Sequence, residues 1–475
     1  MRPADTGPAP VKAPEKGPAT IARRVVPAAV ALVLSLVVGI VTDGPTVWGL
    51  LPVALYAVLS LTGTDLVAVT AVSLVSAVLV ALPPVADAAG VLGASVSDPV
   101  TIIGLIIVLG SAVGEILRVT GVADAMVRGI LRVAGGRGHT ALMYAMMIAC
   151  LVLVTSLGTL AGALAIAAPL LIPVAARAGF TRSATAVTMF LGGCAGLALA
   201  PFAGSNVAIM KVADTDYLTY LMVGAGPLAL LSLLLAAVVV PRVQRLSAAR
   251  DDFYGPDEAA EQEPNGRTAA GTRRATYAFL ITLIGTVVYA TWTKAGTTFP
   301  LIALPLMAVV TAVAARLSLR HALRAVVTGG RRMLPTLLLF WMLAALFGFI
   351  ELLHPYDVVL DTFGPGLREM SPLPFALAIA ALGWVGVPGA TAAQVVLIGE
   401  VFGPLGTGLG IGPAAWVIIL LWASKADTYG PLPNANMVGA MGVARATRLP
   451  YLLGAGWALL VPACALYTVL LALLL

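Results

Sequence analysis

The chain has 475 residues, of which 60% are hydrophobic and only 11% are charged, whereas soluble globular proteins carry about 25% charged residues. Apolar runs that reach the roughly 20 residues of a membrane-spanning helix recur along the whole sequence. This composition excludes a water-soluble enzyme and predicts an all-α polytopic membrane protein. The net charge of +6 is expected on the cytoplasmic side of a lipid bilayer, with no nucleic-acid partner.

The first predicted element is a disordered cytoplasmic tail over residues 1–24, which are rich in Pro, Ala, Lys and Arg. A first transmembrane helix is predicted over residues 25–41. Further apolar runs fill residues 47–241 and 275–475. Between them, residues 242–274 combine Arg, acidic residues, Pro, Gly and Gln. This composition predicts a cytoplasmic linker that divides the chain into two halves.

The two halves resemble each other at an offset of 230 or 231 positions, which indicates a duplicated unit. The matching groups include Pro201 and Asn206 against Pro431 and Asn436, and Gly224-Ala225-Gly226 against Gly454-Ala455-Gly456. We therefore expect repeat 1 over residues 47–241 and repeat 2 over residues 275–475.

The arginines predict that the two repeats point in opposite directions. Residues 84–99 contain no Lys or Arg, whereas the equivalent residues 317–333 contain four Arg. The bias reverses in the next pair, because residues 118–139 contain four Arg and residues 354–371 contain one. Positive residues collect on the cytoplasmic side, so equivalent segments lie on opposite sides and the repeat is inverted. About 11 transmembrane helices and two re-entrant hairpins fit this pattern, with the N-terminus in the cytoplasm and the C-terminus outside.

Inverted repeats are typical of secondary transporters, which bind substrate where interrupted helices of the two repeats meet. Irregular backbone at membrane depth persists only where protein, water, ions or substrate satisfy its polar groups. Hairpin turns are predicted at residues 155–159 and 386–391, and interrupted helices at residues 201–206 and 424–436. The candidate binding residues at these breaks are Thr155, Ser156, Gly158, Thr159, Gly204, Ser205, Asn206, Gly389, Thr391, Ser424, Lys425, Asp427, Asn434 and Asn436. Neutral oxygens suited to Na+ belong to Ser156, Asn206, Thr391 and Asn436.

The charged residues Lys425 and Asp427 occur in the second half only, because Ala195 and Leu197 occupy the equivalent positions of the first half. A charge at this depth is costly unless it is paired or hydrated. One hypothesis is that Asp427 carries a coupling proton or helps to hold a cation, while Lys425 faces the substrate or replaces a second cation. The alternative is that both side chains reach the cytoplasmic surface.

Other polar residues also have structural alternatives. Asn206, Asn434 and Asn436 could form interhelical hydrogen bonds instead of binding a ligand. Glu115, three residues before an arginine, is expected to be solvated or locally paired near the membrane surface. Glu400 is expected at a helix cap or at the interface.

The predicted spans, hairpins, inverted repeats and polar breaks together resemble the ion transporter superfamily. This superfamily includes divalent-anion/sodium symporters, C4-dicarboxylate and gluconate permeases and NhaC-type Na+/H+ antiporters. Ser205-Asn206-Val207 is similar to two of the three positions of the symporters' Ser-Asn-Thr pattern, and residues 155–159 resemble the Gly-rich hydroxyl turn of the NhaC type. The resemblance implies Na+ and a carboxylate bound at the hairpin tips and helix breaks. It also implies a hairpin-bearing domain that moves against a scaffold, within a homodimer.

We therefore expect a secondary active transporter of the bacterial inner membrane that moves a small organic anion, a carboxylate, coupled to Na+ or H+. No cofactor is expected besides the coupling ion. The chain contains no His-Glu-x-x-His, Gly-x-Ser-x-Gly or phosphate-binding loop, so an enzyme is not predicted. The alternatives are an NhaC-type Na+/H+ antiporter, in which Asp427 would exchange the ions, and a passive channel or structural membrane protein.

Overall fold

The computed structural model describes residues 18–42, 44–61, 65–134, 138–256, 258, 270–293, 298–355, 358, 371–384 and 391–475. These residues are almost entirely helical. The described part contains no β-strand, and its one isolated bridge joins Thr181 to Phe253. The predicted all-α fold is confirmed.

The helices follow one another along the chain with short connections. Those before residue 250 are α1 (Pro18–Val41), the 3-10 turn η1 (Val47–Leu50), α2 (Leu51–Leu61), α3 (Leu66–Ala81), α4 (Val85–Ser95), α5 (Pro99–Val119), α6 (Val122–Ala134), α7 (His139–Leu157), α8 (Leu160–Arg177), α9 (Arg182–Leu199), α10 (Gly204–Val212), α11 (Tyr217–Tyr220), the π-turn η2 (Leu221–Ala225) and α12 (Gly226–Ala248). Those after it are α14 (Ala270–Thr293), α15 (Pro300–Ala314), α16 (Leu319–Arg331), α17 (Leu334–Glu351), α19 (Pro372–Leu382), α20 (Thr391–Gly408), α21 (Pro413–Tyr429), α22 (Ala435–Val443) and α23 (Leu449–Leu474).

Two boundaries differ from those predicted. Helix α1 begins at Pro18, so residues 18–24 of the predicted tail are helical. Proline suits the first turn of a helix, because the N–H that it lacks has no partner there. Helix α21 continues to Tyr429 and does not unwind at Ser424 as predicted, because the residues that forbid a helix, Gly430 and Pro431, come later.

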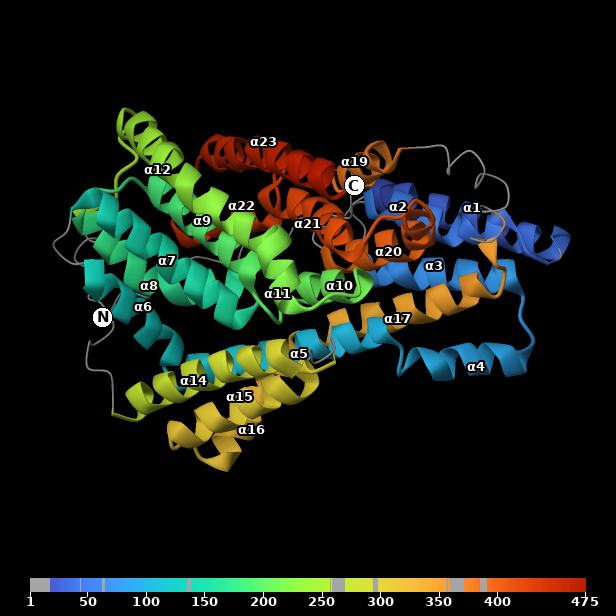
Figure 1. The fold of residues 1–475 in the computed structure, drawn as a ribbon, viewed down its shortest axis with the longest axis horizontal. Helices are drawn as coiled ribbons and strands as arrows, with labels where there is room; N and C mark the ends of the chain where they lie inside the picture. Colours follow the sequence, from blue (N-terminus) through green and yellow to red (C-terminus); the bar gives the residue numbers. More distant parts are fainter. Residues whose placement is uncertain are drawn as a thin grey trace, which may run out of the picture.

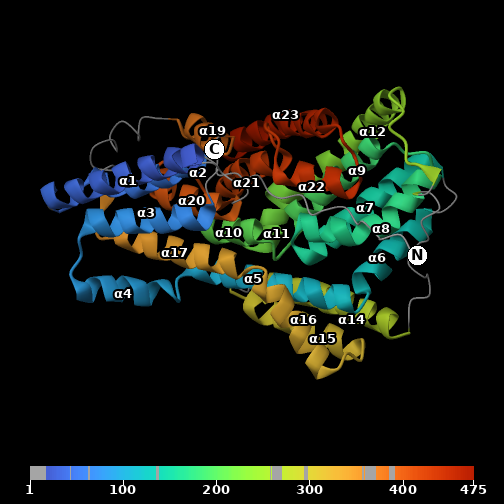
Figure 2. The ribbon, with the colours of Figure 1, turned by 180° about the vertical axis from the view of Figure 1, so that it is seen from behind.

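The helices form two layers (Figures 1 and 2). One layer contains α5 packed against α15, α16 and α17, and α1 to α3 adjoin it through α17. The other contains α9 packed against α7 and α12, with α21 packed against α19 and α23. The short helix α10 and helix α20 pack against each other between these layers, where α10 contacts α5 and α20 contacts α17. The middle of the molecule is therefore built from the elements that follow predicted breaks.

Corresponding helices of the two halves agree in length. Helices α8 and α20 both have 18 residues, and α10 and α22 both have nine. Each pair is separated by the offset found in the sequence. Seven described helices are long and apolar enough to cross a membrane, and six shorter apolar helices accompany them. The count of about 11 spans stays a prediction, as does the homodimer.

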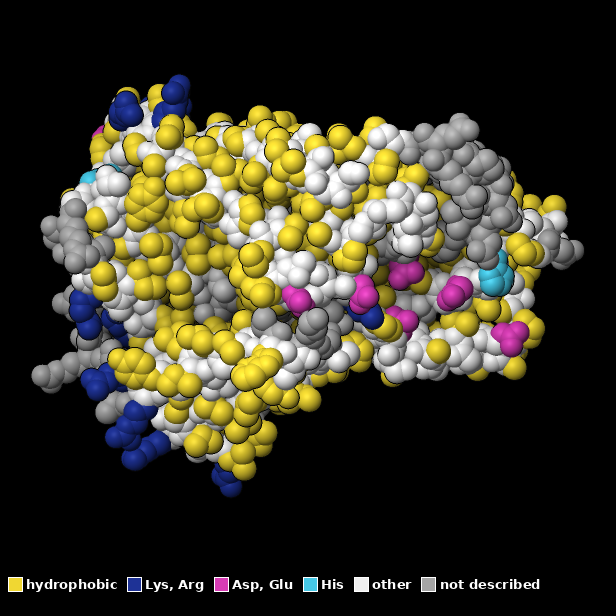
Figure 3. Space-filling model, in the orientation of Figure 1, with side chains coloured by type: hydrophobic (Ala, Val, Ile, Leu, Met, Phe, Trp, Pro, Cys, Tyr) yellow, Lys and Arg dark blue, Asp and Glu magenta, His cyan; other side chains and the backbone are white. Residues whose placement is uncertain are grey.

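Charge is distributed unevenly along the molecule. Lys and Arg side chains gather at the left end of the face in Figure 3, where α12 and α6 end, and acidic side chains lie toward the right half. The arginine-rich stretch 317–333 folds as α16 on the basic side, whereas the arginine-free stretch 84–99 folds as α4 on the other side. This arrangement supports the predicted inversion, which stays a prediction.

At the basic end, a buried carboxylate joins helices of the two halves. Glu115 of α5 is paired with Arg118 on its own helix and with Arg332, whose Nη1 lies 3.0 Å from Glu115 Oε2. The helices approach closely beside this pair, because Ser111 donates a hydrogen bond of 2.9 Å to the carbonyl of Gly329. The local pairing expected for Glu115 is present, and the sequence gave no sign of the partner from the other half.

A second carboxylate, Glu258, ties the start of α9 to the turn between α22 and α23. Arg182 Nη2 lies 2.8 Å from its Oε2, and Arg445 Nη1 lies 3.0 Å from its Oε1. The N–H of Gly255 also donates to Oε2, at 2.7 Å. Burial raises the pKa of Glu258, but these hydrogen bonds and the charge of Arg182 lower it by more, so the pKa lies below its usual value.

We predict that Glu258→Gln lowers the stability of the protein by about 1–2 kcal/mol, because charge-assisted hydrogen bonds are lost. Folding lowers the pKa of Glu258, so its contribution is complete above the ordinary pKa of 4.5 and declines as the pH falls below it. Thermal unfolding in detergent should therefore separate the variant from the parent at pH 7 and less at pH 4. Asp87→Asn, at an exposed position of α4, is the control and should change neither curve. Equal curves for Glu258→Gln and the parent at pH 7 would contradict the prediction.

Candidate functional site

The break after α9 is satisfied by side chains. Asn206 is fully buried, and its Nδ2 donates to the carbonyls of Leu197, Ala198 and Ala200 at 2.8, 3.1 and 2.8 Å. The end of a helix leaves its last carbonyls without backbone partners, and here one amide group serves three of them. The interhelical alternative for Asn206 is thus correct for its nitrogen. The same bonds turn its oxygen, Oδ1, away from α9.

That oxygen accepts a hydrogen bond from Lys425 of α21, whose Nζ lies 3.0 Å from Asn206 Oδ1 and 3.4 Å from Ser205 Oγ. Lys425 is only 2% exposed, so the alternative in which it reaches the cytoplasmic surface is wrong. None of the ion pairs in the described part of the chain includes it. A buried ammonium group is therefore held by two neutral oxygens of the other half.

The neighbours of Lys425 divide into two groups. Ser424 is buried, and its hydroxyl has no hydrogen-bond partner among the described residues. Asp427 lies on the same helix, and its side chain falls outside the described part of the structure. The hypothesis that Asp427 carries a proton stays a prediction.

The first hairpin turn lies against the break after α9. Gly158 has φ +68°, the left-handed conformation that ends α7, and a Cβ there would lie 3.6 Å from Ala203 Cα. Thr159 is extended and precedes α8. Thr155 donates to the carbonyl of Gly196 at 3.0 Å, and Ser156 donates to its own helix. The hydroxyls of the turn are thus bound to backbone, and their lone pairs are available to a cation.

Helix α20 also begins at this place. A Cβ added to Gly204, at the start of α10, would lie 3.7 Å from Ala392 Cβ and 2.3 Å from Ile107 Cδ1. Thr391 is therefore next to the residue that contacts α10, while Gly389 lies outside the described residues. The start of α10 is the point where the first hairpin turn, α20, α5 and Lys425 come together.

The second interrupted helix has a different role. Gly430 has φ +69°, and its neighbours leave no room for a Cβ, which would lie 2.4 Å from the carbonyl oxygen of Leu432. Asn434 and Asn436 donate to the carbonyl of Thr428 at 3.2 and 3.5 Å, and Asn434 caps α22 by accepting from the N–H of Met437. These asparagines cap helices, and no contact brings them to Lys425.

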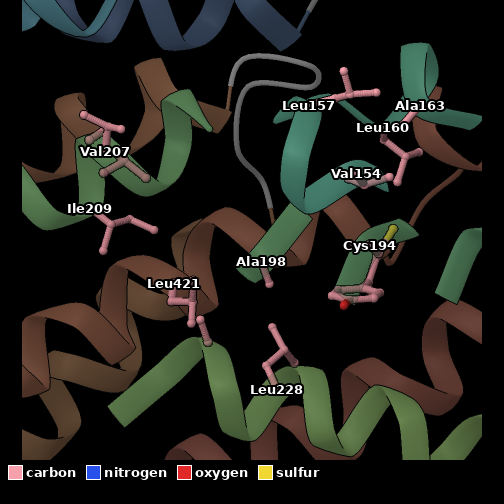
Figure 4. Packing of buried hydrophobic residues seen from close by; sticks show 14 of the residues in the cluster. Val154, Leu157, Leu160, Ala163, Cys194, Ala198, Val207, Ile209, Leu228 and Leu421 are labelled. Atoms are coloured by element: carbon pink, nitrogen blue, oxygen red, sulfur yellow. The ribbon is translucent and has the colours of Figure 1, made fainter. Parts of the chain in front are cut away.

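Apolar residues enclose the break. Figure 4 shows members of one buried cluster from the first hairpin, from α9 and α10, and from α12 and α21 around the end of α9; they are Val154, Leu157, Leu160, Ala163, Cys194, Ala198, Val207, Ile209, Leu228 and Leu421. In such surroundings a hydrogen bond or an ion contact is stronger than in water.

The sequence reasoning missed Gln394. This residue of α20 is buried, and neither atom of its amide has a hydrogen-bond partner in the described part of the chain. Buried amides without partners are rare and point to a bound molecule or to a second conformation. Gln394 is the only amide in the apolar run 391–399, a signal that could have identified it.

An acidic cavity lies at the other side of α20. It has a volume of about 520 Å³ and is lined by Asp98, Glu351, Glu400 and His354, among others. The carboxylates belong to α5, α17 and α20 or to their caps. Their charge favours cations near the molecule. In the part of the chain that is described, no three acidic, His or Cys side chains are close enough to hold a metal ion.

We predict that Asn206→Ala destabilises the protein by about 2–4 kcal/mol, because it leaves buried carbonyls and an ammonium group without partners. The matched variant at the equivalent position, Asn436→Ala, removes one longer hydrogen bond of a partly exposed residue and should cost about 1 kcal/mol or less. Thermal unfolding of both variants in detergent tests the order. A larger loss for Asn436→Ala would show that the amide of Asn206 is not what stabilises the break.

Comparisons with known proteins agree with a transporter fold. Residues 5–241 match the model of the Na+/H+ antiporter family. No curated protein matches the sequence. Among solved structures, the chain is similar to the YdaH transporter of Alcanivorax borkumensis, with 18% identity, a TM-score of 0.59 and coverage of 81% of this chain and 87% of that chain. It is also similar to MtrF of Neisseria gonorrhoeae, described as one of a class of antimetabolite efflux pumps, with 14% identity, a TM-score of 0.44 and 94% coverage of both chains. The likeness to YdaH shows a shared fold. The family to which sequence comparison assigns this chain, through residues 5–241, is the Na+/H+ antiporter family.

Proposed function

We propose that the protein, a secondary transporter, exchanges Na+ for H+ across the bacterial inner membrane, and that Lys425 carries the proton. The family match over residues 5–241 supports this choice over the organic-anion carrier expected from the sequence. The observation that carries the proposal is the contact of Lys425 Nζ with Asn206 Oδ1 and Ser205 Oγ.

An ammonium group and Na+ compete for the same lone pairs. Lys425 donates to two neutral oxygens, and oxygens of this kind are also ligands for hard cations. Both occupants carry one positive charge and cannot share the oxygens. Binding of Na+ therefore requires that the ammonium group leaves, and the return of a protonated Lys425 displaces Na+.

This competition couples the two ions. When Lys425 loses its proton to water, the neutral amine no longer needs both oxygens, and Na+ can bind to them. The total charge of the site is the same in both forms, so neither form leaves an additional charge in the low-dielectric interior. One Na+ is exchanged for one H+ when the two forms open to opposite sides of the membrane.

The amide of Asn206 is prepared for this role. Its nitrogen is held by three carbonyls of α9, so its oxygen points to the site before either cation arrives. A ligand that is oriented in advance loses less entropy on binding.

An organic-anion symporter is the second candidate, and one observation favours it. The ammonium group of Lys425 has no acidic partner among the described side chains, and a substrate carboxylate could take this place. Na+ or H+ would then be bound elsewhere, for example at the hydroxyls of residues 155–159.

We predict that Lys425→Met abolishes Na+-driven proton movement in proteoliposomes with an internal pH dye, with a rate at least about tenfold lower. In the parent protein, raising the pH from 6 to 8.5 should strengthen Na+ binding, measured as a thermal shift, because the competing ammonium group is lost. In Lys425→Met, Na+ binding should not depend on pH. If Asp427→Asn removes the pH dependence while Lys425→Met keeps it, Asp427 is the proton carrier and our assignment is wrong.

A counterflow experiment separates the two candidates. Proteoliposomes loaded with an unlabelled C4 dicarboxylate or gluconate are expected to show no uptake of the labelled compound under any Na+ or H+ gradient, while Na+ still drives proton movement. Labelled uptake that requires Na+ and is lost in Lys425→Met would instead support the symporter. Ion currents that are insensitive to imposed gradients would favour a passive channel.

A further inference from the structure

Helix α16 presents two parallel rows of side chains on its outer surface. Leu319, Leu323 and Val327 are 74%, 56% and 64% exposed, and their spacing of four residues places them on one face. Arg320 and Arg324 form the adjacent row, one position further around the helix, and are exposed as well. The opposite face is buried against α5.

The apolar row of α16 continues the outer surface of a predicted membrane helix. Helix α15 exposes Ile302, Leu306, Val309 and Val313, whose spacing also describes one face. Only Ala315 to Ser318 separate the two helices. The same acyl chains that cover α15 can therefore cover Leu319 and Leu323, and the adjacent arginines then lie at the level of the lipid headgroups.

The positive charge of this region is not balanced. The sequence has no Asp or Glu between Glu263 and Glu351. Among the described residues, neither Arg320 nor Arg324 takes part in an ion pair, and the carboxylate of Glu115 on α5 is occupied by other arginines. Basic side chains mark this corner of the molecule in Figure 3, where Figure 1 places α14 and α16.

We propose that α16 is an interfacial helix that binds the phosphate of an anionic phospholipid through Arg320 and Arg324, with Leu319, Leu323 and Val327 among the acyl chains. Two arginines one turn apart suit a phosphate group, which accepts several hydrogen bonds at once. The site does not depend on the proposed ion exchange. Because α16 packs on α5, and Ile107 of α5 lies against Gly204, a bound lipid would hold the layer on which the start of α10 rests.

The test compares phosphatidylglycerol with phosphatidylcholine as additives in thermal unfolding of the detergent-solubilised protein. Phosphatidylglycerol is expected to raise the unfolding temperature of the parent, and phosphatidylcholine is not. The double variant Arg320→Gln/Arg324→Gln should require an about tenfold higher concentration of phosphatidylglycerol for the same shift. Arg242→Gln/Arg245→Gln removes the same charge from two exposed positions of α12 and is the matched control.

Three results would overturn the proposal. An equal loss in the Arg242/Arg245 control would show diffuse attraction to the basic end instead of a site. A shift of the same size with inorganic phosphate would identify a soluble anion as the ligand. Conversion of a dimer to a monomer by Leu319→Ser/Leu323→Ser, measured by size-exclusion chromatography with light scattering, would show that this face binds a second copy of the chain.

Discussion

A helix that ends inside a membrane protein must find donors for its last carbonyl groups, and the structure around α10 depends on how α9 meets this requirement. The carbonyls of Leu197 and Ala200 accept from Asn206, that of Leu199 accepts from Tyr217, and that of Ala198 accepts from Asn206 and Tyr220. The donors of Asn206 are used up in this way, and its oxygen remains. Lys425 binds that oxygen, so the helix break of one half decides where the buried charge of the other half lies.

The two halves have diverged at this point. Asn436 occupies the position equivalent to Asn206, yet it is only partly buried and makes one hydrogen bond of 3.5 Å. Ala195 stands where the second half has Lys425. Two buried ammonium groups facing one break would repel each other, so a single lysine is the arrangement with the lower electrostatic cost. A symmetric fold thereby holds an asymmetric site.

Carboxylates bridge the halves at the basic end, once in each layer. Glu115 joins α5 to the end of α16, and Glu258 joins the start of α9 to the turn before α23. Each binds two arginines that would otherwise repel each other. At the other side of α20, the acidic residues around the 520 Å³ cavity leave that region attractive to cations. The ends of the molecule therefore differ in charge, while the middle is held by neutral oxygens and one ammonium group.

Local chemistry allowed much of this to be predicted from the sequence. The break before Gly204 and the turn at Gly158 lie where Pro, Gly and hydroxyl residues interrupt apolar runs, because these residues act on their own backbone whatever surrounds them. The all-helical fold likewise follows from composition and run length. The second break was predicted too early, since Ser424 and Lys425 are compatible with a helix and only packing decides whether they remain in one.

The tertiary structure alone decided which distant groups meet. Nothing near Lys425 in the sequence indicates that it binds Asn206 and Ser205, and nothing near Glu115 indicates Arg332. The partnerless amide of Gln394 is likewise visible only once its neighbours are known. The sequence by itself determined the helices, their breaks and the end of the molecule that carries positive charge, because these depend on backbone propensity, hydrophobicity and net charge over short stretches. The site depends on contacts across more than 200 residues, and such contacts follow from the packing of whole helices.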